Sequence, residues 1–480
     1  MEEAAGFSTG RYRRSILAAT VVAPLLFLAF SWPLILSGAN KGRGASDSIN
    51  YHEKAIRAFS SQFPSLDFSD YLSATTPGYH VLVALFGRVV SPDRTALQLF
   101  SSLLSAGLIA TLASACAWRM RRALSPFGVI AVCLPFMTSL YVLSSGVWLL
   151  PDNTAWWLLL CVLLLSLRRS QHAGVWFASG LLLVALVFAR QIHIWAAAII
   201  WLAAWIGPGP ARSDAPLLMR QDVGGLVLPR IARACIALLL TLPAFALLYW
   251  FYKLWGGLTP PTFKPMHGFS PQAAAPAFDL ALLAIAGVFY ISYWWEPFLK
   301  LLREQIWAVV LAAAIGLVLA TLPATTESPS HGRVSGIFHA VKIAPVLFAH
   351  TSLLIAPLST LGAVILVAWL RAMNPRARWI MLAAIAGFSA ANAANPQLWQ
   401  RYHEPFILMW TILAASLAVW SGGSAVKRPG LFATVGPLAL AALLAAVSVR
   451  GIFYERTAQD AGFSPGHVEP SALNPAIPEP

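Results

Sequence analysis

Charged residues and cysteines are scarce in this sequence. Asp, Glu, Lys and Arg make up 11% of the 480 residues, whereas soluble domains carry roughly a quarter. The 4 cysteines lie in apolar runs without metal-like spacing, so we interpret them as small core residues. The sequence also lacks a phosphate-gripping Gly-rich loop, a His/Cys metal cluster and a Ser or Cys nucleophile motif. A cytoplasmic enzyme that uses nucleotide sugars would need a soluble nucleotide-binding domain, and the chain has no room for one. We expect neither a metal nor a cofactor.

Apolar residues are abundant instead. They make up 58% of the chain, and the mean hydropathy is +0.69. Apolar runs of about 18 residues recur, and each can cross roughly 30 Å of hydrocarbon. The pattern predicts an all-α, polytopic bundle of about 13 transmembrane helices. The expected spans are 15–37, 95–117, 126–147, 154–167, 174–190, 193–206, 232–252, 278–299, 305–322, 346–370, 379–394, 405–421 and 430–449.

The net charge of +14 comes from short basic clusters between the apolar runs, such as Arg119, Arg121 and Arg122. Placing these clusters in the cytoplasm satisfies the positive-inside rule at almost every crossing, and most acidic residues then lie outside. The basic balance therefore indicates topology rather than a nucleic-acid partner. The apolar run 15–36 is long and lacks a clear cleavage site, so we expect it to be the first span and not a cleaved signal.

The first outer loop, 38–94, is expected to hold two interfacial helices. One covers 48–62, where apolar residues recur at helical spacing. The other covers 79–90; if this segment crossed the membrane, the cluster at Arg119 would lie outside, against the charge rule. We expect one transmembrane domain over residues 1–450, followed by a disordered Pro-rich tail over 451–480.

Polar and ionisable residues collect at the outer ends of the predicted spans. Such residues are costly at membrane depth and tend to be functional. Carboxylates occur early in the chain, and Arg and His recur later. A site that deprotonates a hydroxyl and expels a phosphate needs both kinds of group, a carboxylate as general base and fixed cations for the leaving phosphate. The pattern favours a lipid-linked phosphate substrate at the membrane face.

Four motifs, in order, resemble the GT-C superfamily of polytopic glycosyltransferases, and more narrowly the dolichyl-phosphate-glucose α-1,2-glucosyltransferases. An Asp precedes an aromatic-His pair, a Thr-Thr-Pro segment follows, an Arg-Gln ends a middle span, and Arg-Tyr precedes Pro-Phe. The matching segments here are Asp47 to His52, Ala74 to Tyr79, Phe188 to Trp195 and Arg401 to Phe406. The resemblance implies a GT-C fold and a bacterial relative of the family that uses a polyprenyl-phosphate sugar. Glucose is the sugar that the resembling family transfers.

The resemblance and the polar pattern together predict an inverting glycosyltransferase in a bacterial inner membrane, with its site facing the periplasm. The predicted partners are membrane lipids, the polyprenyl-phosphate sugar donor, and a glycan or lipid-linked acceptor. Asp47 is the expected general base, with Asp70 as the second choice. Arg190, Arg401, His193 and His403 are expected to hold the donor phosphate. The residues expected to bind the sugar or acceptor are Tyr51, His52, Thr75, Thr76, Tyr79, Asp152, Gln191 and Tyr402.

Two other classes of function fit the same sequence. A transporter or flippase for lipid-linked saccharides would also have an outward polar cavity, and it predicts broken helices in both halves of the chain. A non-catalytic partner in polysaccharide assembly is the other alternative, and for that protein Asp47 would be dispensable. The mostly uninterrupted apolar runs favour the enzyme.

Overall fold

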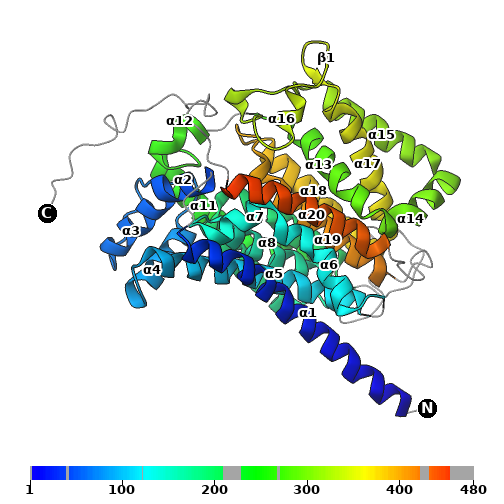
Figure 1. Cartoon of the computed structure of the whole chain (residues 1–480), viewed down its shortest axis with the longest axis horizontal. Helices are drawn as coiled ribbons and strands as arrows, with labels where there is room; N and C mark the ends of the chain where they lie inside the picture. The colour runs from blue at the N-terminus through cyan, green and yellow to red at the C-terminus, as the bar shows by residue number, and fades with distance from the viewer. Residues whose placement is uncertain are drawn as a thin grey trace.

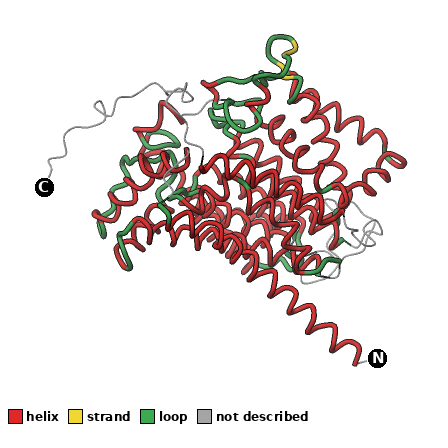
Figure 2. The backbone as a smooth tube through the Cα atoms, in the orientation of Figure 1, coloured by secondary structure: helices red, strands yellow, loops and turns green. Residues whose placement is uncertain are grey.

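The computed structural model describes residues 3–38, 43–121, 123–208, 229–267, 271–421 and 432–453. Within these ranges the regular structure is helical, apart from a small antiparallel hairpin of β1 (Val346–Leu347) and β2 (Thr351–Ser352) (Figure 2). The predicted all-α class is confirmed with that exception. The predicted disordered tail lies outside the described residues from position 454 onward.

Among the described residues, six helices are long and apolar enough to cross a membrane. At 1.5 Å per residue, even 18 residues span about 27 Å, close to the thickness of the hydrocarbon layer. The chain is therefore a multi-pass integral membrane protein. The six helices are α1 (Glu3–Leu36), α5 (Arg94–Met120), α11 (Arg230–Trp255), α17 (Ile355–Ala372), α19 (Glu404–Trp420, preceded by the turn η5, Gln400–Tyr402) and α20 (Phe432–Phe453).

Two predicted single spans are broken. The predicted span 126–147 consists of α6 (Pro126–Thr138) and α7 (Leu140–Val147), which meet at 74°. The predicted span 278–299 consists of α13 (Ala275–Phe289) and α14 (Ile291–Glu304), which meet at 106°. Hydropathy averages over a window and does not detect a single non-helical residue between two apolar segments. Counting each pair as one span raises the number of crossings to eight.

The count of about 13 spans stays a prediction, because the remaining helices are either shorter than 18 residues or, like the 18-residue α18 (Pro375–Asn392) with its two arginines, less apolar. A helix of 16 residues covers about 24 Å and crosses the bilayer only where the membrane or the packing accommodates it. The other helices of the bundle are α8 (Asp152–Leu167), α9 (Ala173–Ala189), η2 (Gln191–Ala196), α10 (Ala197–Ile206), α15 (Ile306–Thr321) and α18 (Pro375–Asn392).

The described part of segment 38–94, the predicted first outer loop, contains the two expected helices. The second of them, α4, has 12 residues and a length of about 18 Å, too short to cross the bilayer. The short elements α2, α3, α4 and α12 lie on the same side of the molecule, as Figure 1 shows. These four helices are α2 (Arg43–Asp47), α3 (Glu53–Gln62), α4 (Gly78–Val89) and α12 (Lys264–His267). The turn η1 (Ser48–His52) joins α2 to α3, and η3 (Pro261–Phe263) precedes α12. A later loop contains η4 (Pro329–His331) and α16 (Phe338–Val341).

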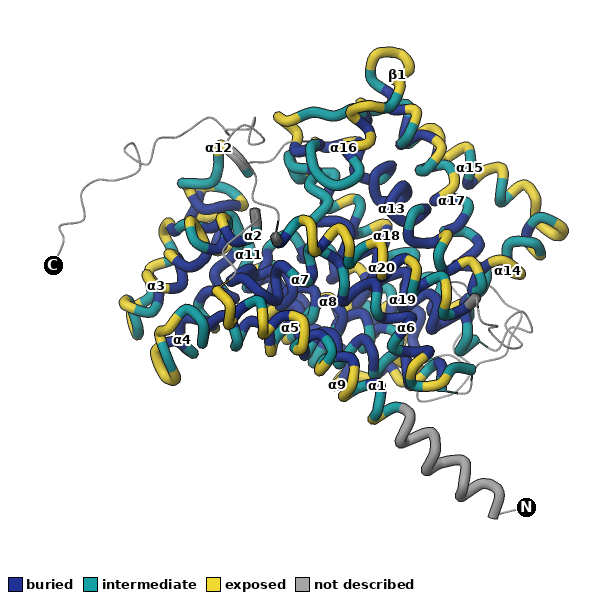
Figure 3. The backbone as a smooth tube through the Cα atoms, viewed as in Figure 1, coloured by how far each residue is buried: buried dark blue, intermediate teal, exposed yellow. Residues whose placement is uncertain are grey.

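Helix α19 lies at the centre of the bundle. Its apolar window is 89% buried within the protein, against 22% for α11 and 28% for α20. The helices at the periphery, such as α11 and α15, instead carry many exposed apolar side chains. Figure 3 colours much of the backbone at the periphery as exposed. The Arg-Tyr-His segment predicted to be functional lies directly before this central helix, in η5 and at the N-cap residue His403.

Candidate active site

Two ion pairs surround the ring of Tyr402. Arg401 in η5 donates to Asp47 at the end of α2, across 354 positions of the sequence. Arg190 donates to Asp152 at the start of α8. The guanidinium carbons of Arg190 and Arg401 lie 4.6 Å and 5.0 Å from the centre of the Tyr402 ring, within cation–π range. We call these five residues the charged cluster.

The local backbone explains how Arg190 and Asp152 reach the cluster. Helix α9 ends at Ala189, and Arg190 is extended, with φ −161° and ψ 107°, before the turn η2 begins. This break turns the Arg190 side chain away from the direction of the helix. Asp152 is the first residue of α8, where the partial positive charge of a helix N-terminus favours a carboxylate.

The cluster runs from a buried end to a partly open end. The side chains of Asp152 and Arg190 are 11% and 9% exposed, whereas those of Asp47 and Arg401 are 21% and 23% exposed. Arg401 also lies 5.2 Å from the centre of the Trp399 ring, and its Nη2 donates to the Tyr402 hydroxyl at 3.3 Å. The Asp47–Arg401 pair is therefore the more accessible of the two ion pairs.

The two arginines are close enough to share one ligand. Their distances to the Tyr402 ring centre limit the separation of the two guanidinium carbons to at most about 9.6 Å. A guanidinium binds phosphate oxygens through parallel N–H donors at about 2.7–2.9 Å. A phosphate bound to Arg401 would compete with the Asp47 carboxylate for that guanidinium, whereas the Asp152–Arg190 pair is the more buried of the two.

His52 lies beside the cluster as a neutral side chain. Its Nδ1 is 2.9 Å from Nε2 of His80, and the two rings stack with centres 5.2 Å apart. Burial lowers the pKa of His52 to about 4, although the nearby Asp47 carboxylate opposes this shift. At neutral pH His52 therefore acts as a hydrogen-bonding group, which fits its predicted role toward a sugar hydroxyl better than a role as a cation.

The Thr-Thr-Pro segment is tied to the end of α9. Thr76 donates through its hydroxyl to the Val187 carbonyl at 2.6 Å, and its N–H donates to Gln191 Oε1 at 2.9 Å. Gln191 in turn donates to the carbonyls of Ala74 at 2.8 Å and Leu258 at 2.9 Å. The predicted ligand residues Thr76 and Gln191 thus hold the first outer loop in place beside Arg190.

The predicted residues Thr75, Tyr79 and Tyr51 make other local contacts. The Thr75 hydroxyl is 3.0 Å from that of Ser73, and the buried Tyr79 hydroxyl is 2.9 Å from Ser101. The Tyr51 ring packs edge-on against Phe263, with centres 5.5 Å apart. Of these three side chains, only Tyr51 is exposed.

Asp70, the second choice for the base, binds the loop that contains η3. Its carboxylate accepts from the Thr262 hydroxyl at 2.6 Å and from the Thr262 N–H at 3.3 Å. Asp47 instead contacts Arg401 inside the cluster. The geometry therefore favours Asp47 over Asp70 as the residue next to the cations.

The predicted phosphate ligands His193 and His403 lie in the aromatic core. His193 packs against Trp156 with ring centres 4.9 Å apart, and neither of its ring nitrogens has a hydrogen-bond partner among the described residues. His403 Nδ1 is 2.6 Å from Asp279 Oδ1, and both residues are almost fully buried. His403 thus pairs with an acid in α13 rather than with a member of the cluster, because successive residues at the start of α19 point to different sides.

Sequence reasoning missed Asp279. This carboxylate accepts from the Ser389 hydroxyl at 2.6 Å and pairs with His403. Asp279 stands inside an apolar run, and an ionisable residue in such a run is itself a functional signal. A second missed residue is His267, whose ring is 5.8 Å from Trp399 and whose pKa burial lowers to about 4, with the Arg401 charge adding to the shift.

Comparison with protein-family models, curated proteins and solved structures found no match. The functional assignment therefore depends on the residues of the chain itself. Its main support is the charged cluster, in which two early carboxylates meet two later arginines.

Proposed function

We propose that this chain is an integral membrane glycosyltransferase of GT-C type with about 13 spans. It transfers a sugar from a polyprenyl-phosphate donor to a hydroxyl of a glycan or lipid-linked acceptor on the outer face of a bacterial inner membrane. The observation that carries the proposal is the contact between Asp47 and Arg401, next to a second pair, Asp152–Arg190. A base and a phosphate-binding cation are thereby adjacent.

The reaction is a single displacement with inversion. The acceptor oxygen forms a bond to the anomeric carbon of the sugar as the bond from that carbon to the phosphate oxygen breaks. The hydroxyl proton passes to the Asp47 carboxylate, and polyprenyl phosphate leaves with the bonding electron pair. Arg401 and Arg190 stabilise the negative charge that grows on the leaving phosphate.

Donor binding also prepares the base. Asp47 is paired with Arg401. A donor phosphate competes for the same guanidinium, and its binding frees the Asp47 carboxylate for the acceptor hydroxyl. Asp152 stays with Arg190 at the buried end, so Arg190 keeps its orientation during this exchange.

The test is donor cleavage by the purified protein. The protein is incubated with a panel of labelled polyprenyl-phosphate sugars and candidate acceptors, and the release of polyprenyl phosphate and labelled glycan is measured. Asp47→Asn should lower transfer by about 100-fold or more, the usual contribution of a positioned base, whereas Asp70→Asn should retain it. Transfer by Asp47→Asn at the wild-type rate would refute the assignment.

A transporter or flippase for lipid-linked saccharides is the second candidate, and the two bent helix pairs favour it. One bend lies in each half of the chain, at Ser139 and at Tyr290. The Tyr290 hydroxyl donates to the Val132 carbonyl of α6 at 2.6 Å, which connects the two bent pairs. Broken helices in both halves are typical of transporters. In liposomes, this function predicts movement of the lipid-linked saccharide across the bilayer without cleavage of its sugar–phosphate bond.

A further inference from the structure

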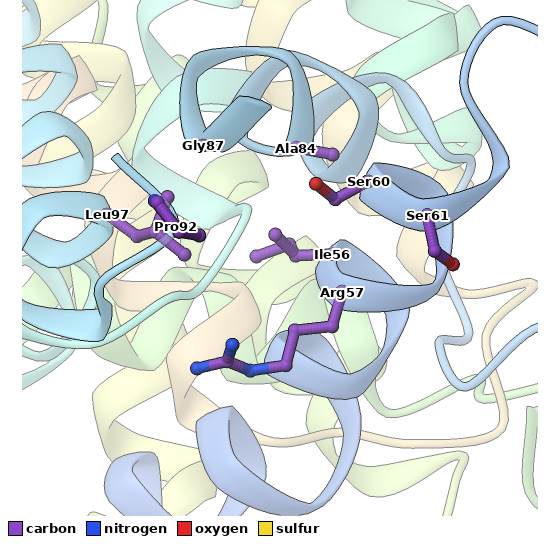
Figure 4. A pocket seen from close by; sticks show the side chains of 8 residues that line it. All are labelled: Ile56, Arg57, Ser60, Ser61, Ala84, Gly87, Pro92 and Leu97. Carbon is purple, nitrogen blue, oxygen red and sulfur yellow. The ribbon is translucent and has the colours of Figure 1, made fainter. Parts of the chain in front are cut away.

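A pocket of about 240 Å³ lies between α3, α4 and the start of α5, apart from the residues of the charged cluster (Figure 4). Its inner wall is apolar, since Ile56, Ala84 and Leu97 are almost fully buried. Gly87 leaves the space open: a Cβ at this position would lie 3.1 Å from Leu97 Cδ2. The remaining lining residues are Arg57, Ser60, Ser61 and Pro92.

The rim of this pocket is polar and carries several guanidinium groups. Arg57 donates to Glu53 Oε1 through Nε at 3.0 Å and Nη2 at 2.7 Å, and its side chain remains 54% exposed. Arg94 Nε lies 3.2 Å from the other oxygen of Glu53, and Arg88 donates to the Ser60 carbonyl at 3.4 Å. Arg57 lines the pocket, whereas Arg88 and Arg94 lie beside it through their contacts with Ser60 and Glu53. These three arginines outnumber the Glu53 carboxylate and that of Asp93, which precedes Arg94, so the surroundings of the pocket carry an excess of positive charge.

The neighbouring surface of α4 is strongly apolar. Leu82, Leu85, Val89 and Val90 are 40%, 45%, 74% and 65% exposed. Contact with water would cost about 25 cal/mol for each Å² of this apolar surface, whereas contact with acyl chains removes the cost. A short helix with an apolar face beside a polar, basic one lies at the membrane interface. An apolar face beside basic side chains is typical of a segment at the level of the lipid headgroups.

We propose that this pocket binds the headgroup of an anionic phospholipid. The phosphate contacts Arg57 and Arg88 and the hydroxyls of Ser60 and Ser61, and the acyl chains lie along the exposed apolar face of α4. The apolar wall at Ile56 accommodates the glycerol backbone. This lipid site is independent of the proposed transfer reaction, because none of its residues belongs to the charged cluster.

The test is lipid retention by the purified full chain in a neutral detergent, measured by native mass spectrometry. Added phosphatidylglycerol should bind. The zwitterionic phosphatidylcholine should bind at least about tenfold more weakly, because its choline group offsets the charge of its phosphate. The double variant Arg57→Gln, Arg88→Gln should bind phosphatidylglycerol at least about tenfold more weakly than the wild-type chain does. Arg303→Gln, which removes an exposed guanidinium on α14, is the matched control and should not change binding.

Three outcomes would overturn the proposal. The first is equal retention of both lipids by the wild-type chain, and the second is full retention of phosphatidylglycerol by the double variant. The third is displacement of the lipid by millimolar inorganic phosphate or glycerol phosphate, which would assign the pocket to a soluble anion. Gly87→Val provides a separate check because it fills the pocket without changing its charge, and it should also weaken lipid retention.

Discussion

Replacing Asp47 by Asn separates the two roles that the ion pair with Arg401 combines. The variant removes the proposed base, and it also removes the carboxylate that competes with phosphate for the Arg401 guanidinium. We therefore expect opposite effects on the two halves of the reaction. Transfer should fall by about 100-fold or more, while the product polyprenyl phosphate should bind more tightly.

The size of the binding effect follows from the exposure of the pair. The side chains of Asp47 and Arg401 are 21% and 23% exposed. Exposed ion pairs contribute about 0.2–1 kcal/mol, and breaking a fully buried pair costs about 3–5 kcal/mol. The free energy of the Asp47–Arg401 interaction should lie between these two values. An intermediate value of about 1–2 kcal/mol corresponds to roughly 5- to 30-fold tighter binding of polyprenyl phosphate.

The assay is equilibrium binding of a fluorescent, short-chain polyprenyl monophosphate to the purified protein, alongside the transfer rate. Asp70→Asn is the matched control, because Asp70 binds Thr262 and its loss should leave both quantities near the wild-type values. Unchanged or weaker phosphate binding in Asp47→Asn would show that Asp47 and the phosphate do not compete for Arg401, and the proposed coupling would be wrong.

Three further predictions follow from the same contacts. Arg401→Ala should weaken donor use more than Arg401→Lys, because Lys keeps the charge but loses the two-pronged donor; equal losses in steady-state kinetics would contradict a bidentate phosphate contact. Asp279→Ala should lower the thermal stability of the detergent-solubilised protein by the equivalent of about 1–3 kcal/mol, because it leaves the buried His403 ring without its hydrogen-bond partner, and wild-type melting would contradict this. The pKa of His52 is about 4 in the folded protein and about 6.5 in the unfolded chain, so the unfolded chain takes up the proton first as the pH falls. The protein should therefore lose stability between about pH 6.5 and pH 4. Melting curves of His52→Gln should show a smaller loss over this pH range than those of the wild-type protein.

The sequence alone determined the helical, membrane-embedded character of the chain. A segment in hydrocarbon must satisfy its own backbone hydrogen bonds, so a long apolar run forms a helix whatever its neighbours are. The predicted spans 95–117 and 232–252 fall inside α5 and α11 for this reason. The charge rule also predicted that early acids and later arginines share one side, and the contact between Asp47 and Arg401 agrees with that expectation.

Only the tertiary structure decided which groups pair. The partners Asp47 and Arg401 are 354 positions apart, and Asp279 and His403 are 124 apart, so no local pattern relates them. The bends at Ser139 and Tyr290 were equally hidden, because hydropathy averages over many residues whereas one residue with a non-helical backbone is enough to turn a helix. Apolar patterning is a property of each segment by itself, but a side-chain contact depends on where the whole bundle places two segments.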